Sequence, residues 1–245
     1  MSEIIKTEAV VLSKMNYGDT SLIASLFTKE LGKISAIVKG GRNPKSKIAL
    51  KVDPLNLLEV VFYNKLNRDL QIVSSADIIS HYPAIKSELE KLKYGQSVLE
   101  IVKYLTVEHE QNLRLFNGIV RIFSLLEESK GGQNLVFARF FLFFITELGY
   151  QIQFQKCVSC GTGGFGGKSI FYNFDQGMLC NNCSKNFIES FEIYPELLDC
   201  LIGLRTNKIL DNVSKKTVDN AIAFMEKFLK YHISDFKGIK SLQLL

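Results

Sequence analysis

Four cysteines constrain this chain more than any other feature of its sequence. Cys157, Cys160, Cys180 and Cys183 form two C-x2-C pairs that are separated by nineteen residues. Two-residue spacing lets both thiolates of a pair reach one ion from a tight turn, so two such pairs can close a tetrahedral four-thiolate zinc site. Because protein sulfur fills all four ligand positions, none is left for water. The pattern therefore predicts one structural zinc ion and argues against a hydrolytic metal.

The residues that flank the two pairs favour a zinc ribbon at 156–184. Five glycines fall among residues 161–167 and Gly177 precedes the second pair, which supplies the turns that a ribbon requires. The alternative is that the cysteines form two disulfides or match the pattern by coincidence. The N-terminal residues lack a charged region followed by an apolar one, so we expect no secretory signal, and the total of five cysteines is odd. Both observations favour zinc over disulfides.

The length and composition predict more than one domain. The chain has 245 residues, of which 47% are hydrophobic, enough for one large core or two smaller ones. Its longest apolar stretch, Leu135–Leu148, is interrupted by Arg139 and falls short of the roughly 20 residues that a membrane span needs. We therefore expect a soluble protein of the cytoplasm.

The first 80 residues have the pattern of a small β-domain. Runs rich in Ile, Val, Leu and Phe alternate in part and are separated by the turn sequences NYGD, KELG and NKLNRD. The predicted strands cover residues 4–13, 21–28, 32–40, 55–63 and 69–75. Five short strands in this length predict a closed barrel, and the economical candidate is an OB-fold, which commonly binds single-stranded nucleic acid.

After residue 80 the apolar residues recur at helical spacing. Helices are predicted over 89–105, 115–126 and 133–148, and the third is apolar on nearly all sides, as expected of a helix at the centre of a bundle. Pro195 suits the first turn of another helix, and Ser214 suits the cap of one that reaches His232. The predicted fold class is multidomain α+β, with a barrel domain at 1–80 and a helical domain at 81–245 that contains the zinc module.

A basic segment follows the third predicted strand. Residues 39–51 contain no acid, and their basic residues are Lys39, Arg42, Lys45, Lys47 and Lys51. Gly40 and Gly41 would let the backbone approach a partner, and the partner that this charge favours is phosphate, held without reading of base sequence. The alternative is a solvated basic loop. Base-stacking faces could come from Tyr17, Phe27, Phe62 and Tyr63, of which at least half are expected in the core or on neutral surface.

The sequence contains no recognisable catalytic constellation. His81, His109 and His232 are scattered, and there is no P-loop, no G-x-S-x-G and no G-x-G-x-x-G that opens a helix after a strand. Cys200 has apolar neighbours at helical spacing and is interpreted as a core thiol. The chain is therefore predicted not to be an enzyme. An RNA-binding module of transcription or translation, or an enzyme that uses the ribbon as a scaffold, are the other classes to weigh.

Three segments resemble the RecO family of bacterial recombination mediators. EAVVLSKMNYGDTSLIASLFTKELGKISAIVKGGRNPKS is similar to its N-terminal OB domain, whose third strand ends in a basic Lys-Gly-x-Arg loop. LVFARFFLFFITELGYQIQFQKCVSCG resembles the helix that leads into the family's zinc module, and YHISDFKGIKSLQLL resembles its closing Lys-Ser element. The family often has Ala in place of Gly41 and a further basic residue in place of Asn43.

The resemblance implies a non-enzymatic DNA repair protein of the RecF pathway. Such proteins bind single- and double-stranded DNA, anneal complementary strands and, with RecR, help to load RecA onto strands coated by single-stranded DNA-binding protein (SSB). They also recognise the tail of SSB through their helical domain. Phosphate contacts are accordingly expected at Lys39, Arg42, Lys45 and Lys47, with Arg68 as a weaker contact across the barrel. The implied location is the cytoplasm, at the nucleoid.

Overall fold

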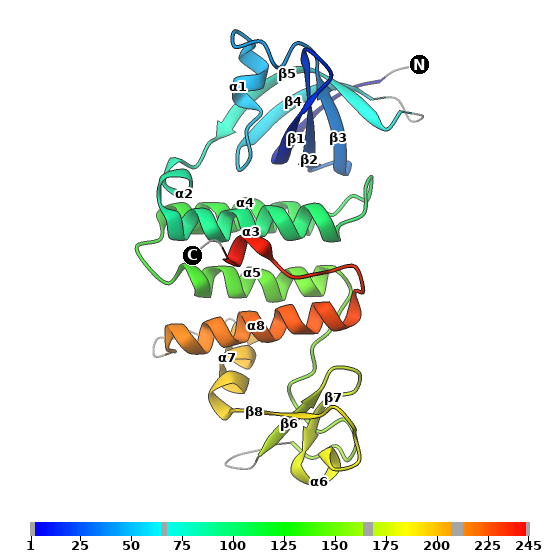
Figure 1. Cartoon of the computed structure of the whole chain (residues 1–245), viewed down its shortest axis with the longest axis vertical. Coiled ribbons are helices and arrows are strands. Elements are labelled where there is room, and N and C mark those ends of the chain that lie inside the picture. Colours follow the sequence, from blue (N-terminus) through cyan, green and yellow to red (C-terminus); the bar gives the residue numbers. More distant parts are fainter. Residues whose placement is uncertain (1–2, 65–67, 164–168, 207–212, 244–245) are drawn as a thin grey trace. The chain divides into compact units, whose positions relative to one another are not determined.

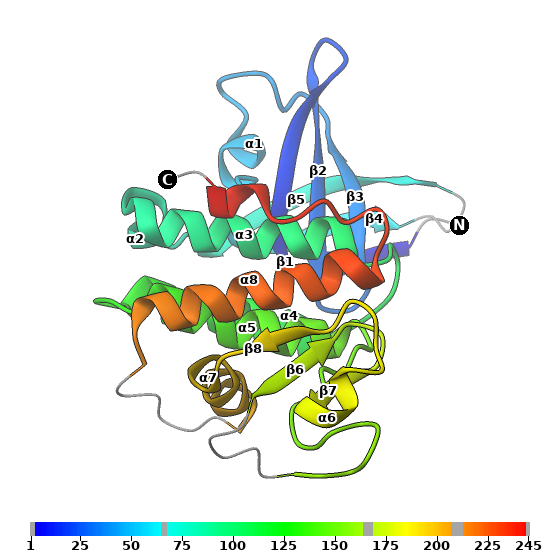
Figure 2. The same cartoon turned by 60° about the horizontal axis from the view of Figure 1, so that its bottom comes forward.

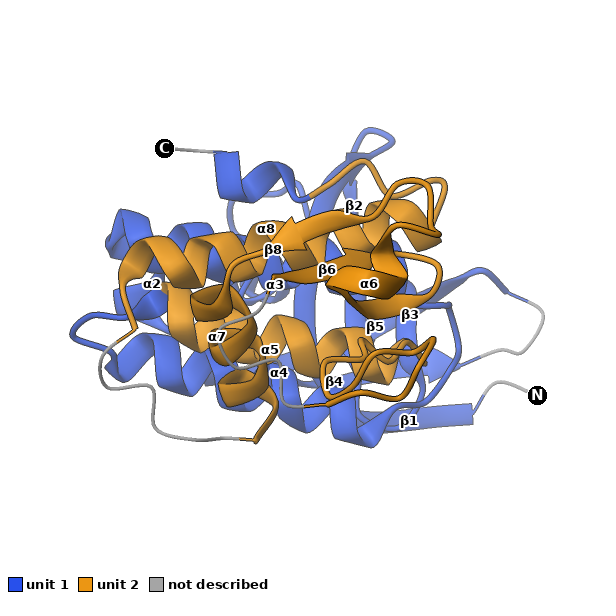
Figure 3. Ribbon diagram, turned by 90° about the horizontal axis from the view of Figure 1, so that it is seen from below, with its two compact units in different colours: residues 1–133, 239–245 blue, residues 134–238 orange. Residues whose placement is uncertain are grey.

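A computed structural model describes residues 3–64, 68–163, 169–206 and 213–243 of the chain (Figure 1). It contains two compact units (Figure 3). Unit 1 comprises Met1–Gln133 and Ile239–Leu245, and unit 2 comprises Asn134–Gly238. Unit 2 is thus an insertion between two parts of unit 1. No helix in the described ranges combines the length and the apolar content that crossing a membrane requires.

Unit 1 begins with a closed five-stranded barrel, as the sequence predicts. Its strands are β1 (Glu3–Tyr17), β2 (Ser21–Thr28), β3 (Gly32–Val38), β4 (Leu57–Asn64) and β5 (Leu70–Ser80). They close in the order β1-β2-β3-β5-β4, and β4 pairs with β1. All neighbours are antiparallel except β3 and β5, which are parallel. This order and number of strands is that of an OB-fold.

Alternating apolar side chains fill the interior of the barrel. Ala24 on β2, Ile34 and Ala36 on β3, and Val60 and Phe62 on β4 are all fully buried. Because successive residues of a strand point to opposite faces, the residues between them lie on the outside. A bulge in β1 between Val11 and Ser13 interrupts this alternation, so the second half of β1 has the opposite parity to the first half.

The connection between β3 and β4 contains a short helix, α1 (Lys47–Lys51), that the sequence analysis did not predict. The side chain of Ser46 caps it by accepting a hydrogen bond from the amide of Ala49, at 3.3 Å. Ala49 and Val52 of this connection belong to the core of the barrel. The basic segment is therefore anchored at its C-terminal end by apolar packing.

Three helices follow the barrel within unit 1: α2 (Pro83–Ser87), α3 (Leu89–Leu105) and α4 (Leu113–Glu128). The turn between β2 and β3 fits against the loop that joins α3 to α4. Gly32 has φ +66°, and a Cβ atom there would lie 1.9 Å from the carbonyl oxygen of Glu110, so only glycine fits. Lys33 donates a hydrogen bond of 2.8 Å to the carbonyl of Lys103 in the last turn of α3, where a cation is favoured.

Two carboxylates hold backbone amides within unit 1. Glu127 of α4 accepts hydrogen bonds of 2.9 Å from the amides of Ala84 and Ile85 in the first turn of α2. Glu100 of α3 accepts hydrogen bonds of 2.8 Å from the amides of Lys240 and Ser241, which open the 3-10 helix η1 (Lys240–Gln243). The Lys-Ser element near the C-terminal end is therefore tied to α3, although 139 or more residues separate them in the chain.

Unit 2 combines helices with a small sheet (Figure 2). Its elements are α5 (Gln133–Glu147), β6 (Ile170–Asn173), β7 (Gly177–Cys180), α6 (Asn181–Ser184), β8 (Phe191–Ile193), α7 (Pro195–Thr206) and α8 (Lys215–His232). The strands form an antiparallel sheet in the order β7-β6-β8. Only Thr146 of α5 is exposed, as its apolar sequence predicts, and Ser214 caps α8.

The helical predictions agree with these bounds to within a few residues. The three-stranded sheet and α6 form the module that carries the cysteines between α5 and α7, which confirms the predicted fold class. Three of the glycines predicted to support its turns, Gly164, Gly166 and Gly167, lie outside the described residues. The domain boundary expected at residue 80 stays a prediction, since the two compact units divide the chain at other positions.

Candidate metal centre and nucleic-acid interface

The structure brings the four predicted cysteine ligands together in unit 2. Their sulfur atoms all lie within 4.8 Å of one another, and the Sγ atoms of Cys160 and Cys180 are 3.8 Å apart. Tetrahedral coordination with Zn–S bonds of about 2.3 Å would place the sulfur atoms about 3.8 Å apart. The cluster therefore has the size and the donor set to hold a single metal ion.

The first cysteine pair lies on a tight turn that backbone hydrogen bonds fix. The amide of Cys157 donates to the carbonyl of Thr162 at 2.8 Å, and the amide of Gly161 donates to the carbonyl of Cys157 at 2.9 Å. Gly161 has φ +73°, a left-handed conformation that favours glycine. The turn thereby directs two sulfur atoms to one point.

The second pair is placed by the junction of a strand and a helix. Cys180 ends β7 and precedes α6, and Cys183 lies within that helix. The amide of Val158 donates a hydrogen bond of 2.9 Å to the carbonyl of Met178 on β7, which holds the first turn against the second. Cys157 is buried, whereas Cys160 is exposed, so solvent reaches the cluster from the side of Cys160.

The electrostatics of the cluster favour a bound cation. Hydrogen bonding to the side chain and the backbone of Thr162 lowers the pKa of Cys160 to about 6. A hydrogen bond with Ser159 lowers the pKa of Cys183, but the sulfur atoms of Cys180 and Cys160 outweigh it and raise that pKa to about 12. The closeness of the four sulfur atoms therefore opposes ionisation of all four cysteines, because four thiolates at this spacing would repel one another. A divalent ion would remove this repulsion, and thiolate donors suit zinc and other soft or borderline metals.

An aromatic cluster joins the cysteine module to α8. Phe224 of α8 lies 5.0 Å from Tyr172 of β6, 5.8 Å from Phe174 and 6.4 Å from Phe191 of β8, measured between ring centroids. Phe154, which precedes the first cysteine pair, lies 6.2 Å from the same ring. Tyr172 is almost fully buried. The module that holds the cysteines therefore packs against the buried core of unit 2.

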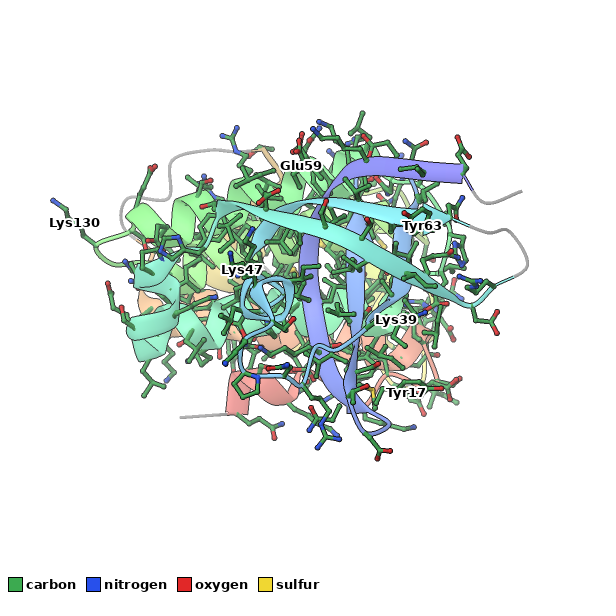
Figure 4. The ribbon with its side chains drawn as sticks, turned by 90° about the horizontal axis from the view of Figure 1, so that it is seen from above. Tyr17, Lys39, Lys47, Glu59, Tyr63 and Lys130 are labelled. Atoms are coloured by element: carbon green, nitrogen blue, oxygen red, sulfur yellow. The ribbon has the colours of Figure 1, made fainter. Side chains whose placement is uncertain are left out.

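The predicted phosphate-binding side chains of unit 1 are all exposed except Arg68, which is half-buried. Lys39, Lys45 and Lys47 form no ion pair with another residue in the part of the chain that the structure describes. Figure 4 shows Lys39 and Lys47 on the barrel in the view from above. Their charges remain available to a polyanion.

Arg42 is partly engaged within the protein, and Lys51 is fully so. The Arg42 guanidinium donates to the carbonyl of Gly18 at 2.6 Å and its amide donates to the carbonyl of Thr20 at 2.9 Å. Arg42 therefore ties the basic loop to the turn between β1 and β2. Lys51 pairs with Asp77 at 2.6 Å, which removes the fifth cation of the run from the free surface.

The aromatic residues proposed from sequence as base-stacking faces fall into two groups. Phe27 and Phe62 are buried in the core and cannot contact a ligand. Tyr17 and Tyr63 are 48% and 41% exposed, and both lie on the barrel (Figure 4). The expectation that at least half of the four belong to the core or neutral surface is confirmed.

Sequence reasoning missed the apolar side chains on the outside of the barrel. Met15 and Ile4 of β1 are 62% and 64% exposed, although outer strand positions are normally polar. The signal that could have found Met15 is the bulge, because it shifts the outward positions of β1 from even to odd residues. A bulge cannot be located from a single strand sequence.

These features define a class of protein. A barrel with OB strand order and an exposed basic loop, joined to a helical region with a four-cysteine cluster, is the architecture of a nucleic-acid-binding protein with a metal-binding module.

The family follows from comparison with known proteins. The family model "Recombination protein O N terminal" matches residues 1–82, and "Recombination protein O C terminal" matches residues 86–243. The chain therefore belongs to the RecO family, whose members are DNA repair mediators and not enzymes. This confirms the family that the sequence resembles.

Three relatives carry the description "DNA repair protein RecO". That of Chlorobium phaeobacteroides strain BS1 is 37% identical over 180 residues, which cover 74% of this chain and 67% of the relative. That of Chlorobium limicola is 34% identical over 64% of this chain and 60% of its own length. That of Chlorobium luteolum is 27% identical over 99% of this chain and 97% of its own length.

Proposed function

We propose that this chain is a DNA-binding recombination mediator of the RecF pathway. It binds single- and double-stranded DNA, anneals complementary strands and, with RecR, helps to load RecA onto single-stranded DNA coated by SSB. The observation that carries the proposal is a group of exposed lysines on an OB-type barrel that form no ion pair with any residue the structure describes. Membership of the RecO family supports it.

Annealing needs no catalytic side chain. Two complementary strands repel each other through their phosphates, and a basic surface that holds both of them lowers this repulsion. Base pairing then supplies the driving force. The proposed activity consumes no nucleotide, which fits a chain whose sequence has no nucleotide-binding loop.

We assign the phosphate contacts to Lys39, Lys45 and Lys47, with Arg42 and Arg68 as further contacts. Arg42 keeps guanidinium N–H groups beyond the one that donates to Gly18, so it can position the hairpin and contact phosphate together. In this proposal residues 1–80 form the DNA-binding domain. Residues 81–245 form the helical domain, which recognises the tail of SSB.

We further propose that the four cysteines hold one structural zinc ion. Four thiolates leave no position for water, and their spacing fits tetrahedral coordination. When bound, the positive zinc ion would offset the negative charge of the thiolates and would cross-link two segments of the module. A DNA-binding role also places the protein in the cytoplasm, at the nucleoid.

The decisive experiment is strand annealing by the purified protein, with and without its cognate SSB. We expect the protein to accelerate annealing of complementary oligonucleotides without ATP, and to do so also when SSB covers them. Competition with structured RNA is the companion measurement. If structured RNA displaces bound DNA more effectively than single-stranded DNA does, the chain would instead be an RNA-binding module. Nucleotide hydrolysis that a point mutation abolishes would contradict a non-enzymatic role.

A further inference from the structure

A turn in unit 2 gathers aromatic rings and carboxylates at the surface. Phe174 and Asp175 lie in the turn between β6 and β7, and Tyr231 lies near the end of α8. The ring centroids of Phe174 and Tyr231 are 5.6 Å apart, and the ring planes are tilted by 32°. A hydrogen bond with the Asp175 carboxylate raises the pKa of Tyr231, and the negative charge of Glu189 acts in the same direction, so Glu189 also lies near this ring. We call Phe174, Asp175, Ile188, Glu189 and Tyr231 the turn surface.

The side chain of Asn173 fixes the geometry of the turn surface. Its oxygen accepts hydrogen bonds from the amides of Asp175 and Gln176, at 2.9 and 3.0 Å. Its nitrogen donates a hydrogen bond of 3.2 Å to the carbonyl of Ile188. Asn173 is buried, so these bonds are shielded from water. One buried amide therefore holds both carboxylate-bearing segments in place before any partner binds, which lowers the entropic cost of binding.

The apolar part of the turn surface is open to solvent. Ile188 is 91% exposed and Tyr231 is 45% exposed, while Phe174 is half-buried. The hydrogen bond from Asn173 to the backbone of Ile188 holds this isoleucine beside the turn. Apolar side chains that are gathered in one place, with aromatic rings among them, are characteristic of surfaces at which proteins dock.

The charge of the turn surface decides what kind of partner it fits. Neither Asp175 nor Glu189 forms an ion pair with a residue that the structure describes. Lys230 in the last turn of α8 pairs with Glu226, at 2.8 Å, and not with these carboxylates. Residues 169–199 as a whole contain five acids and one base. This excess of negative charge repels DNA phosphates and attracts a basic partner.

Arginine is the basic side chain that suits the turn surface best. Its planar guanidinium stacks on aromatic faces and forms bidentate hydrogen bonds with carboxylates, whereas the lysine ammonium is a compact, strongly hydrated charge. The faces of Phe174 and Tyr231 are available for stacking, and the carboxylates of Asp175 and Glu189 are the acceptors. The exposed side chain of Ile188 suits an apolar residue next to the arginine.

We propose that the turn surface is a protein-docking site, which binds an arginine and a neighbouring apolar residue of a partner protein. The inference goes beyond the proposed function, because it assigns a protein interface to unit 2, whereas the assigned phosphate contacts belong to unit 1. The two surfaces carry opposite charge. A basic partner and a polyanion therefore select different surfaces of the same chain.

The first test uses a fluorescently labelled peptide of alternating arginine and valine as the probe. Its anisotropy during titration with the full chain measures the dissociation constant. A peptide with citrulline in place of arginine has a similar shape without the charge, and we expect it to bind roughly tenfold more weakly. A peptide with lysine in place of arginine should fall between the two. If the arginine peptide binds no more tightly than either of the others, the proposal is overturned.

The second test locates the contact on the chain. Tyr231→Ala removes an aromatic face, and Asp175→Asn and Glu189→Gln each remove one carboxylate, so each should weaken binding of the arginine peptide severalfold. Tyr104→Ala and Glu128→Gln are the matched controls, because Tyr104 is 69% exposed, Glu128 is exposed and both belong to unit 1. Neither control should change the affinity. Equal weakening by Glu128→Gln and Glu189→Gln would show that the peptide responds only to net charge, and the proposal would fail.

A conservative variant separates contact from folding. The ring of Tyr231 also lies 5.3 Å from that of His232, so Tyr231→Ala can loosen the end of α8. Tyr231→Phe keeps the ring and loses only the hydroxyl group, so it should retain most of the affinity for the arginine peptide. Thermal unfolding of each variant checks that it folds. If Tyr231→Phe folds and binds as weakly as Tyr231→Ala, the aromatic face is not the contact and the proposal is overturned.

Other occupants of the turn surface give different results. If Tyr231→Ala loses binding to oligo(dT), the turn surface belongs to the DNA site and the inference is overturned. If wild type forms a concentration-dependent dimer that Tyr231→Ala does not form, the occupant is a second copy of this chain, and the assignment to another protein is wrong. If wild type binds the arginine peptide but no DNA, the inference stands and the proposed function fails.

Discussion

At the scale of single residues, equal charges in the basic segment have different roles. Lys39, Lys45 and Lys47 point their charge into solvent, Arg42 holds the β1–β2 turn, and Lys51 is neutralised by Asp77. The sequence marks all five as basic and acid-free but cannot distinguish them. Only the fold shows which cations remain available to phosphate, because the partner of Arg42 comes from the β1–β2 turn and that of Lys51 from β5.

Replacing the three free lysines together should weaken DNA binding and its dependence on salt. In Lys39→Ala, Lys45→Ala, Lys47→Ala protein, three phosphate contacts are lost, so the slope of log K against log salt should become less steep by about 2 for single strands, at roughly 0.7 per contact. Titrations at several salt concentrations measure it. Lys130→Ala, an exposed lysine after α4, is the control. An unchanged slope in the triple variant would mean that the loop is only solvated.

Asp53 should make stability depend on pH in the acid range. Burial raises its pKa, but hydrogen bonds from Lys14 and Lys86 outweigh burial and hold the pKa below the ordinary value of 3.8. A depressed pKa in the folded state stabilises the protein above pH 3.8, and this contribution is lost as pH falls through the lower folded value.

Asp53→Asn should therefore lower the free energy of unfolding by about 1 kcal/mol or less at neutral pH, since the ion pairs with Lys14 and Lys86 are partly exposed and screened. At the acid end of this pH window the substitution should not change the free energy of unfolding. Urea unfolding at a series of pH values measures the difference. Glu59→Gln, which breaks the more exposed pair with Lys6, is the comparison. A cost that persists at the lowest pH would show that charge is not its origin.

At the scale of elements, the local sequence pattern was sufficient to predict most helices and strands but not which strands pair with one another. Alternation predicted the five strands, and Pro195 and Ser214 marked two helix starts that the structure confirms. The parallel pairing of β3 with β5 depends on contacts distant in sequence, and α1 was hidden because KIALK is too short to show a period. Strand β8 has only three residues, which is likewise too few to show a period. The cysteine set was predicted in full because its spacing is itself the signal.

The contact between α8 and the cysteine module should be a major source of stability for unit 2. Phe224→Ala removes a buried ring that four other aromatic rings surround, and the cavity should cost about 3–5 kcal/mol in the free energy of unfolding. Chemical denaturation measures it. Leu125→Ala, on the exposed side of α4, should cost well under 1 kcal/mol. Equal costs for the two substitutions would contradict this account.

At the scale of the whole molecule, metal and DNA are assigned to different compact units. The cysteines belong to unit 2, and the free lysines belong to unit 1. Each unit has its own buried core, so loss of one ligand set need not unfold the other unit. The metal is therefore expected to act on folding, and on DNA only indirectly.

Changing Cys157 and Cys160 to Ser should abolish zinc binding of order one ion per chain. It should also lower the stability of unit 2 by several kcal/mol, because metal-binding free energy appears as folding free energy. Metal analysis and thermal unfolding measure the two effects, and weak binding to single-stranded DNA should survive. Cys200→Ala, at a buried thiol outside the cluster, should keep the zinc. The hypothesis fails if wild type contains no zinc or if the double variant unfolds no more readily.

Glu100 accepts two hydrogen bonds from the amides of Lys240 and Ser241, and this pair of bonds, which we call the clasp, has a consequence for biosynthesis. Residues 239–243 complete unit 1 but follow all of unit 2 in the chain, so a ribosome must translate Asn134–Gly238 before the clasp can close. At a translation rate of roughly 5–20 residues per second, the synthesis of Asn134–Gly238 takes on the order of 5–20 s, and the clasp cannot form during this time. During that interval the nascent chain carries an incomplete unit 1, and a chain that stalls within unit 2 leaves the Glu100 carboxylate without those two amides.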